Sequence, residues 1–316
     1  MKVIIYISNY NSLGGVETFV NNFIKRMNSY FDLTLLFDQY DNVDLLLRAA
    51  EHCNVLKLEH DKEYICDVFI NSTAWGYEPY NNIKANKHIQ VVHADYGYYI
   101  DGWNFSYKKH KKVTHHVCVG QTVKVAFEKA TNFKCDKVIY NLLDNSIKAP
   151  VKPKNKKLHL VTLSRISGEK GFNRMIQLAE QLEQEKIPYI WNVWGDNSNV
   201  WCQKIVSKFS HLKNVVFNGI TTEPFKEITK ADYLVQLSDT EGFCYSVYEA
   251  MQMKTPCIIT PFNSGQEQII DGKNGYIVPF DMKGIDLNKI KTTIPKVDSF
   301  KELGKESDWL ELIKND

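Results

Sequence analysis

The sequence predicts an α/β protein built from two domains with parallel sheets, and three observations support this fold class. Short apolar runs alternate along the chain with segments of helical spacing, as in sheets covered by helices on both faces. The length of 316 residues suits two such domains, and a hydrophobic content of 44% is enough for their cores. The lysine- and proline-rich segment SIKAPVKPKNKK, residues 146–157, reads as a linker between the halves.

Composition excludes several classes of protein. A formal net charge of +2 is too small to predict nucleic acid as a partner. Seven scattered cysteines without a Cys-x-x-Cys pair favour reduced thiols in a cytoplasm over disulfides or a zinc site. The apolar run at the N-terminus is too short for a signal peptide, and no stretch approaches the roughly 18 apolar residues of a membrane span. We therefore expect a cytoplasmic protein that is soluble or peripheral on the inner face of a membrane.

The first half opens with a buried strand at Lys2–Ser8, a turn, and a helix at Val16–Met27 with one apolar face. Gly14 and Gly15 in the turn would let a ligand approach the backbone beside a helix start that favours anions. An ordinary tight turn explains the same pair. Further segments are predicted as strands at Leu33–Phe37, Asn54–Leu58, Asp67–Asn71, Ile89–His93 and Val113–Val119, and as helices at Val43–His52 and Val123–Ala130.

Two features of this half bear on ligands. His93 closes a predicted strand, where ligands of open α/β sheets bind, although a lone histidine is commonly structural. The loops are rich in aromatic side chains that stack on sugar rings or pack within the protein; these are Trp75, Tyr77, Tyr80, Tyr96, Tyr98, Tyr99 and Trp103. The basic run Lys108–Lys112 follows directly. Such a run is usually a solvated face, and beside exposed aromatics it would also suit contact with anionic lipid.

The second half begins with a predicted strand at Leu158–Leu163 and a turn that carries two cations, Arg165 and Lys170. Arginine offers a planar fork and lysine a mobile point charge, so two cations before a helix suit a diphosphate. The order of residues is not that of a Walker loop. Tyr189–Gly195 and Val215–Gly219 are predicted as further strands with their turns.

The stretch Tyr233–Thr260 has the pattern of a strand, a turn, a helix from about Cys244 to Met253, and a second strand at Cys257–Thr260. Glu241 lies in the turn and Glu249 in the helix, with seven residues between them. Carboxylates accept sugar or ribose hydroxyls, and amides at a helix start hold phosphate, so the stretch suits a nucleotide-sugar. A glutamate in an early helical turn is also common without any ligand.

EGFCYSVYEAM resembles the Glu-x7-Glu motif of the retaining glycosyltransferases of family 4, the glycosyl transferases group 1. GGVE at residues 14–17 resembles the family's N-terminal glycine loop, and Arg165 to Lys170 its diphosphate site, with Ser164 replacing a glycine. Glu267, Gly272 and Gly275 match a further segment, in which Asn263 and Ser264 stand where a glycine pair is usual. The resemblance covers residues 1–280 in family order.

The resemblance implies the GT-B fold, in which two Rossmann-like domains face across a cleft. It implies domains at 1–148 and 158–295, a linker at 149–157, and a C-terminal segment, 296–316, whose helix at Ser299–Ile313 returns to the first domain. The implied reaction moves a sugar from a UDP- or GDP-sugar to a hydroxyl of a glycan or lipid-linked acceptor with retention of configuration. Rivals are a nucleotide-sugar 2-epimerase and a non-catalytic GT-B binding subunit.

The resemblance also assigns roles. Catalytic roles fall to Arg165, Lys170, Glu241 and His93; donor contacts to Gly14, Gly15, Gly195, Gly242, Phe243, Cys244, Tyr245, Ser246 and Glu249; and acceptor contacts are expected at Trp75, Tyr96 and Trp103. The departing phosphate takes the acceptor's proton, so no protein nucleophile is required. The chain has no Asp-x-Asp, and we expect neither a metal nor another cofactor. Cys244 replaces the family's usual glycine or proline.

Overall fold

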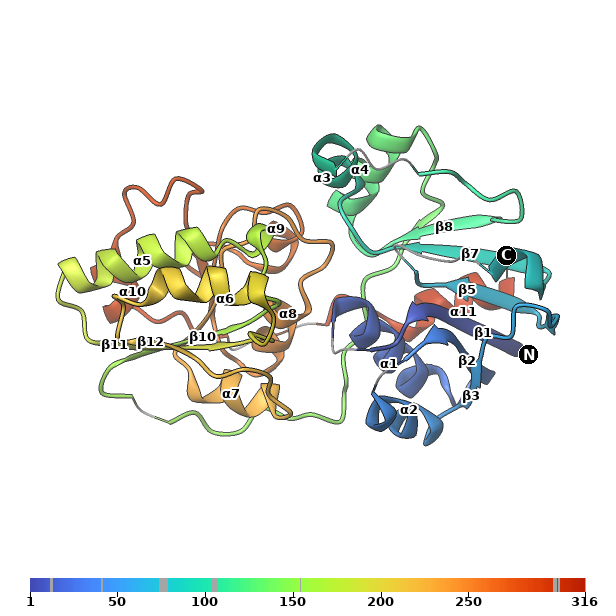
Figure 1. Ribbon diagram of the computed structural model, residues 1–316, viewed down its shortest axis with the longest axis horizontal. Coiled ribbons are helices and arrows are strands. Elements are labelled where there is room, and N and C mark those ends of the chain that lie inside the picture. The colour runs from blue at the N-terminus through green and yellow to red at the C-terminus, as the bar shows by residue number, and fades with distance from the viewer. Residues whose placement is uncertain are drawn as a thin grey trace. The chain divides into compact units, whose positions relative to one another are not determined.

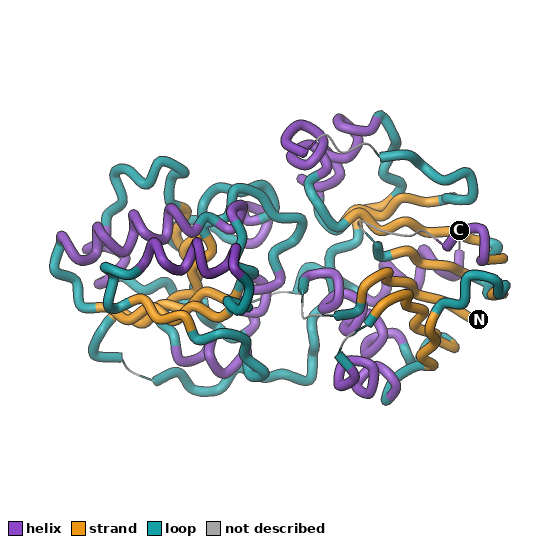
Figure 2. Tube along the Cα trace, viewed as in Figure 1, coloured by secondary structure: helices purple, strands orange, loops and turns teal. Residues whose placement is uncertain are grey.

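The computed structural model describes residues 1–11, 14–40, 42–73, 79–103, 107–153, 155–297, 300 and 302–315, without the side chains of 101–103. The chain divides into two compact units. Unit 1 comprises Met1–Asn145 and Glu302–Asp316, and unit 2 comprises Ser146–Lys301. Figure 1 labels many of the helices and strands of both units, and Figure 2 separates helices, strands and loops by colour.

Unit 1 is a parallel sheet with the strand order β3-β2-β1-β5-β7-β8-β9, and β4 and β6 form a separate parallel pair. Its strands are β1 (Lys2–Asn9), β2 (Asp32–Gln39), β3 (Asn54–Lys57), β4 (Tyr64–Ile65), β5 (Val68–Asn71), β6 (Ile83–Lys84), β7 (Lys87–Val92), β8 (His115–Cys118) and β9 (Lys137–Val138). Its helices are α1 (Gly15–Met27), α2 (Val43–Ala50), the 3₁₀ turn η1 (Pro79–Asn82), α3 (Tyr96–Trp103), α4 (Gln121–Thr131) and α11 (Glu306–Asn315).

The C-terminal helix α11 belongs to unit 1, although the whole of unit 2 precedes it in the chain. Trp309 of α11 is completely buried, with its ring 5.1 Å from that of Phe23 and 5.9 Å from that of Phe19, both on α1. Arg26 of α1 donates to Glu306 at 2.6 Å, which adds an ion pair to this apolar contact. Aromatic packing and a partly buried ion pair therefore fix α11 against α1.

Unit 2 is a second parallel sheet, with the strand order β12-β11-β10-β13-β14-β15. Its strands are β10 (Leu158–Leu163), β11 (Tyr189–Trp194), β12 (Val215–Phe217), β13 (Tyr233–Gln236), β14 (Cys257–Ile259) and β15 (Gly275–Ile277). Its helices are η2 (Gly168–Lys170), α5 (Phe172–Gln184), α6 (Val200–Val206), η3 (Ser207–Phe209), α7 (Pro224–Lys230), α8 (Tyr245–Gln252), α9 (Gly265–Gln268) and α10 (Leu287–Thr292).

Both faces of the unit 2 sheet are buried, which explains why its strands read as nearly continuous apolar runs. Leu160 packs on the face covered by α5, α6 and α10, while its neighbour Val161 packs on the face covered by α7 and α8. Along β13, Tyr233 and Val235 face the first of these layers and Leu234 the second. Figure 1 shows α5 and α7 on opposite sides of the sheet. The predicted two-faced α/β class is confirmed.

The structure corrects three expectations about local structure. The aromatic segment at Tyr96–Trp103 is a helix and not a loop, and the Asp95 carboxylate accepts the Tyr98 amide at its start. The C-terminal helix begins at Glu306, seven residues later than predicted. Lys112 in the basic run is not a free lipid contact, since its Nζ donates to the carbonyls of Tyr80 and Ile83 at 2.7 and 2.8 Å. Contact of the other lysines of the run with lipid stays a prediction.

The described residues include no helix that combines the length and apolar character needed to cross a membrane.

All seven cysteines are free thiols, and six of them are buried.

Candidate functional site

The candidate site of unit 2 lies at the carboxyl ends of β10 and β13. These strands are neighbours in the sheet, but β11 and β12 precede β13 in the chain, so the order of connection reverses between them. Open α/β sheets bind ligands at such a switch point. The turn after β10, residues 164–171, carries the two predicted cations, and the turn after β13, residues 237–244, carries Glu241.

Hydrogen bonds to main-chain carbonyls join the turn after β13 to the turn after β10 and to α5. The Asp239 amide donates to the Glu169 carbonyl at 2.8 Å, and Arg174 Nε donates to the Leu237 carbonyl at 2.8 Å. Gly171 has a φ of +74°, and a Cβ there would overlap the Leu237 carbonyl. Only glycine fits this position, because both the backbone conformation and the close approach exclude a side chain. The cations and Glu241 therefore lie on one rigid platform.

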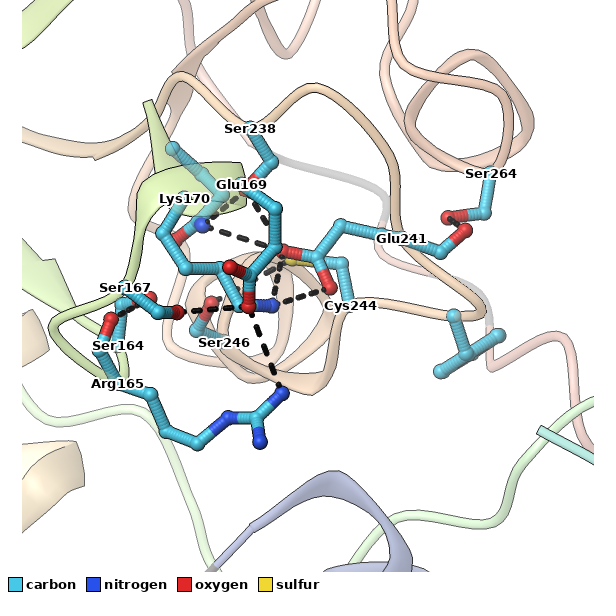
Figure 3. Close-up of polar contacts among 12 residues, drawn as sticks. Ser164, Arg165, Ser167, Glu169, Lys170, Ser238, Glu241, Cys244, Ser246 and Ser264 are labelled. Atoms are coloured by element: carbon cyan, nitrogen blue, oxygen red, sulfur yellow. Dashed lines mark hydrogen bonds and ion pairs between the residues drawn. The ribbon is translucent and has the colours of Figure 1, made fainter. Parts of the chain in front are cut away.

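Lys170 and Glu241 form the centre of the site (Figure 3). Lys170 Nζ lies 2.8 Å from both carboxylate oxygens of Glu241, and the two side chains are only 14% and 11% exposed. Burial alone would lower the pKa of Lys170, but the carboxylate charge and its hydrogen bonds outweigh burial and raise this pKa. The lysine is thus a fixed positive charge in a nearly dry position.

Two residues that the sequence analysis did not single out also hold Glu241. Ser238 Oγ donates to Glu241 Oε1 at 2.7 Å, and Gln236 Nε2 lies 3.2 Å from the same oxygen. Gln236 is the last residue of β13 and is 2% exposed. A polar side chain within a buried apolar strand needs a buried partner, so Gln236 in the run Tyr233–Leu237 was a usable signal.

Arg165 differs sharply from Lys170 in its surroundings. Its side chain is 71% exposed, and its contact with Glu169, at 3.7 Å, is loose. The same oxygen, Glu169 Oε1, accepts a hydrogen bond from Ser167 Oγ at 2.6 Å. In Figure 3 the guanidinium group of Arg165 has a single dashed line, to Glu169. Arg165 is therefore an exposed cation in a loose contact, whereas Lys170 is held by two short hydrogen bonds.

The start of α8 is braced from beneath by the segment around α9. Ser264 Oγ donates to the Glu241 carbonyl at 3.3 Å, and Gln268 Nε2 donates to the Phe243 carbonyl. Cys244 caps the helix with a φ of +57°, a left-handed conformation that usually favours glycine. Its side chain belongs to the core shared by α7 and α8, and burial raises the pKa of its thiol to about 12. The thiol is therefore neutral and unreactive.

The other predicted donor residues of this segment show which groups can face a ligand. Phe243 is 5% exposed and Tyr245 is 8% exposed, with their rings 5.6 Å apart, so both side chains fill the protein interior. Ser246 Oγ lies 3.5 Å from the sulfur of Cys244. The two aromatic side chains are therefore not available to a ligand at this turn.

Glu249 lies in the second turn of α8 and is partly buried. Among the described residues no side chain or amide forms a hydrogen bond or ion pair with its carboxyl group. Burial raises the pKa of Glu249 to about 8, so the group is mostly protonated at neutral pH. It can then donate as well as accept a hydrogen bond.

Two predicted site residues belong to unit 1. The His93 ring packs edge-on against Phe19 with centroids 4.7 Å apart, and its Nε2 is buried without a partner among the described residues. Burial lowers the pKa of His93 to about 3, so the imidazole is neutral. Gly14 precedes α1, but the Glu17 carboxylate would lie 2.6 Å from a Cβ at Gly14. An acidic group beside Gly14 suits hydroxyls better than phosphate, and contact of Gly14 and Gly15 with a donor stays a prediction.

The remaining predicted contacts divide into structural and undescribed residues. A Cβ at Gly195 would overlap the Ser164 carbonyl, so this glycine lets β10 and β11 end side by side. Tyr96 is 1% exposed and packs on Tyr107 and Phe127 at 5.5 and 5.4 Å, so it is a core residue and the expected acceptor contact is wrong. Trp75 and the side chain of Trp103 lie outside the described residues.

Together these groups define what unit 2 can bind. A buried lysine, an exposed arginine and the start of α8 lie on two neighbouring turns, and such groups suit an anion with more than one oxygen. Two carboxyl groups in contrasting states lie on the same strand–helix unit and suit hydroxyl groups. Such a combination matches a ligand that carries phosphate and sugar together.

Part of the chain is similar to known glycosyltransferases. Residues 144–289 match the model of the family "Glycosyl transferases group 1". The chain is 27% identical over 149 residues to "Putative glycosyltransferase EpsD" of Bacillus subtilis (strain 168), and 28% identical over 118 residues to the "Poly(ribitol-phosphate) alpha-N-acetylglucosaminyltransferase" of Staphylococcus aureus (strain COL). These matches cover 46% and 37% of this chain, and span only 39% and 24% of the two relatives.

Among solved structures, Anabaena Alr3699/HepE in complex with UDP and glucose is similar with a TM-score of 0.72 and 16% identity, over 92% of this chain and 90% of that one. The lipopolysaccharide outer core galactosyltransferase WaaB in its apo form is similar with a TM-score of 0.62 and 17% identity, over 94% and 93%. At these identities the likeness concerns the fold. The GT-B fold class with two Rossmann-like domains is confirmed.

Proposed function

We propose that this chain is a retaining, metal-independent glycosyltransferase that moves a sugar from a UDP- or GDP-sugar to an acceptor hydroxyl. The observation that carries the proposal is the buried ion pair at the switch point of unit 2, in which Lys170 Nζ lies 2.8 Å from Glu241 Oε1. The pair lies within residues 144–289, which match the glycosyl transferases group 1 model. The fold shared with HepE, which was solved with UDP and glucose, is compatible with such a donor.

Lys170 and Arg165 are assigned to the diphosphate. Lys170 uses two hydrogen bonds on Glu241, and its ammonium has a third N–H for a phosphate oxygen. Arg165, exposed and loosely held by Glu169, can turn toward the second phosphate as a planar fork. Charge grows on the diphosphate as the bond to the sugar breaks, so fixed cations stabilise the transition state more than the bound donor. In this proposal these cations replace a metal ion.

The carboxyl groups are assigned to hydroxyls. Glu241 accepts from hydroxyls of the donor sugar, and Glu249 binds the ribose. A ribose hydroxyl would give the Glu249 carboxyl a hydrogen-bond partner, which it lacks among the described residues. Main-chain amides from Gly242 to Ser246 add donors to the phosphate. Contacts of His93 and Gly14 with the donor stay predictions.

The proposed reaction needs no protein nucleophile. The bond between the anomeric carbon and the phosphate oxygen breaks, the acceptor oxygen forms its bond on the same face, and the acceptor's proton passes to the departing phosphate. Cell-surface polymers are the acceptor class that we propose, because one relative is named for transfer to poly(ribitol-phosphate) and one structural neighbour for the lipopolysaccharide outer core.

A panel of UDP- and GDP-sugars in a thermal-shift assay tests the proposal. A ligand that binds only the folded protein, at about 100 times its Kd, adds roughly 2.7 kcal/mol to stability and raises Tm by several degrees. At least one nucleotide-sugar should do so and should then be consumed when an acceptor polymer is added. Binding without consumption would indicate a binding subunit, conversion to the epimer without acceptor would indicate an epimerase, and no binding by any member would refute the proposal.

A further inference from the structure

A chain of buried polar side chains leads from the sheet to Glu241. Gln236 is 2% exposed and Ser238 is completely buried. Gln236 Nε2 donates to Ser238 Oγ at 2.6 Å, and Ser238 Oγ donates to Glu241 Oε1 at 2.7 Å. Gln236 Nε2 also reaches Glu241 Oε1 at 3.2 Å. Both residues therefore aim their donors at one oxygen of one carboxylate.

The two oxygens of Glu241 differ in their remaining capacity. Oε1 accepts from Ser238, Gln236 and Lys170, which is more than its two lone pairs hold in ideal geometry. Oε2 accepts from Lys170 alone within the described part of the chain. Only Oε2 can therefore take a further hydrogen bond from a ligand without displacing one already made.

The main chain beneath this polar chain is also fixed. Thr260 Oγ1 donates to the Ser238 carbonyl at 2.6 Å, and the Asp239 amide donates to the Glu169 carbonyl. The Ser238 hydroxyl thus starts from a rigid position, and its hydrogen bond selects one orientation of the carboxylate. A side chain acts precisely when such neighbours restrict its rotamer.

Burial of the glutamine shows that this arrangement is not an ordinary stabilising contact. Gln236 Oε1 is buried without a partner among the described residues, so the side chain leaves one acceptor unsatisfied while its Nε2 reaches Ser238 and Glu241. An unsatisfied buried acceptor is destabilising, and an apolar side chain would avoid it. The orientation of Nε2 is what the glutamine supplies at this position.

We propose that Ser238 and Gln236 are positioning residues that hold Oε1 of Glu241, so that Oε2 faces a hydroxyl of the donor sugar and Lys170 keeps one N–H for the diphosphate. This role rests on the proposed function. It concerns the sugar and not the nucleotide, because neither residue contacts Glu249 or Arg165. A binding experiment that compares the nucleotide-sugar with the bare nucleoside diphosphate can therefore test this role.

The test compares Ser238→Ala with Thr255→Val, a control that removes another completely buried hydroxyl, which donates only to the Ile228 carbonyl at 3.1 Å. Binding of the nucleotide-sugar selected by the panel, and of its bare nucleoside diphosphate, is measured by calorimetry. Ser238→Ala should bind the bare diphosphate within about twofold of the wild type and the nucleotide-sugar about tenfold more weakly, as expected for one hydrogen bond to a charged group. Thr255→Val should leave both affinities unchanged.

Two further variants keep the test decisive. Gln236→Met removes the amide, and it should weaken binding of the nucleotide-sugar but not of the bare diphosphate. Ser238→Thr keeps the hydroxyl and should restore most of the nucleotide-sugar affinity. Equal losses for both ligands would reveal a merely structural role, and unchanged nucleotide-sugar affinity in Ser238→Ala would also overturn the proposal. Failure of the wild type itself to bind any nucleotide-sugar would instead refute the proposed function, and the positioning role with it.

Discussion

Glu241 and Glu249 lie eight positions apart on one strand–helix unit, yet their surroundings are opposite. Glu241 is 11% exposed and is held by a lysine, a serine and a glutamine. Glu249 has no partner for its carboxyl group among the described residues, and burial alone raises its pKa to about 8. Spacing therefore brings the pair to one site, but the neighbours decide what each carboxyl can do.

The two carboxyl groups therefore lie in different parts of the site: Glu241 is already hydrogen-bonded by protein groups, and Glu249 is not. Around Glu241 the charges and hydrogen bonds that would meet the diphosphate and the sugar are already in place without a ligand, which is the preorganisation that electrostatic catalysis requires. Around Glu249 a partly buried carboxyl group has no protein partner among the described residues, so a ligand can supply one. We expect substitutions near Glu241 to affect turnover and stability together, and substitutions at Glu249 to affect nucleotide binding.

The largest effect is expected from Lys170→Ala. The change leaves the buried Glu241 carboxylate without its cation and removes the fixed charge from the diphosphate, so kcat/KM for transfer should fall about a hundredfold or more, and unfolding free energy by about 3 kcal/mol. Kinetics and urea denaturation measure the two losses. Lys213→Ala, at an exposed lysine that donates only to the Ser210 carbonyl, is the matched control. Near-normal kcat/KM in Lys170→Ala would show that the lysine is structural.

Arg165→Ala should separate the two effects that Lys170→Ala combines. Its side chain is 71% exposed and its ion pair is loose, so unfolding free energy should stay within about 0.5 kcal/mol of the wild type. Transfer should still fall at least tenfold, which corresponds to about 1.4 kcal/mol of lost phosphate stabilisation. Equal kcat/KM in variant and wild type would remove Arg165 from the site.

Glu249→Ala should weaken binding of the bare nucleotide about fivefold to tenfold, because the ribose loses one hydrogen-bonding partner. The loss should be the same for nucleotide and nucleotide-sugar, in contrast to Ser238→Ala, which affects the sugar alone. Calorimetric titration of both variants with both ligands measures the contrast. Unchanged affinity for the bare nucleotide would contradict the ribose role.

Glu249 should also give the protein a pH dependence of its stability. The pKa of Glu249 rises from 4.5 to about 8 on folding, so its contribution to stability is fully present below pH 4.5 and is lost as pH rises to about 8. Glu249→Gln cannot titrate, so the stability of the variant relative to the wild type should increase between pH 5 and pH 8 and then level off. Urea denaturation at several pH values measures this difference, and parallel profiles would show that the carboxyl is ionised in the folded protein.

Much of the sheet architecture could be predicted from the sequence, because strands buried on both faces are apolar throughout. Leu158–Leu163 was predicted to the residue, and most other strands to within two. The helix α3 was missed because its aromatic residues suggested a binding loop, although Asp95 was a usable capping signal. The start of α11 was placed too early because a helical pattern does not mark where tertiary packing begins, and Trp309 sets that contact.

The site was predictable in its residue types but not in its environments. Lys170 and Glu241 are 71 residues apart in the chain, and only the fold shows that they are paired and dry. The same limit applies to Arg165, which is exposed, and to Tyr96, which is buried, since neighbours distant in sequence determine both. Ser238 was missed because a serine in a turn has many ordinary explanations.

The central claim is that Lys170 is the fixed charge that meets the donor's diphosphate. It is tested most directly by the affinities of a nucleoside diphosphate and of the corresponding monophosphate for the wild type and for Lys170→Ala, with the base that the panel selects. The wild type should prefer the diphosphate at least tenfold, and the variant should lose most of that preference. An equal preference in both proteins would contradict the account.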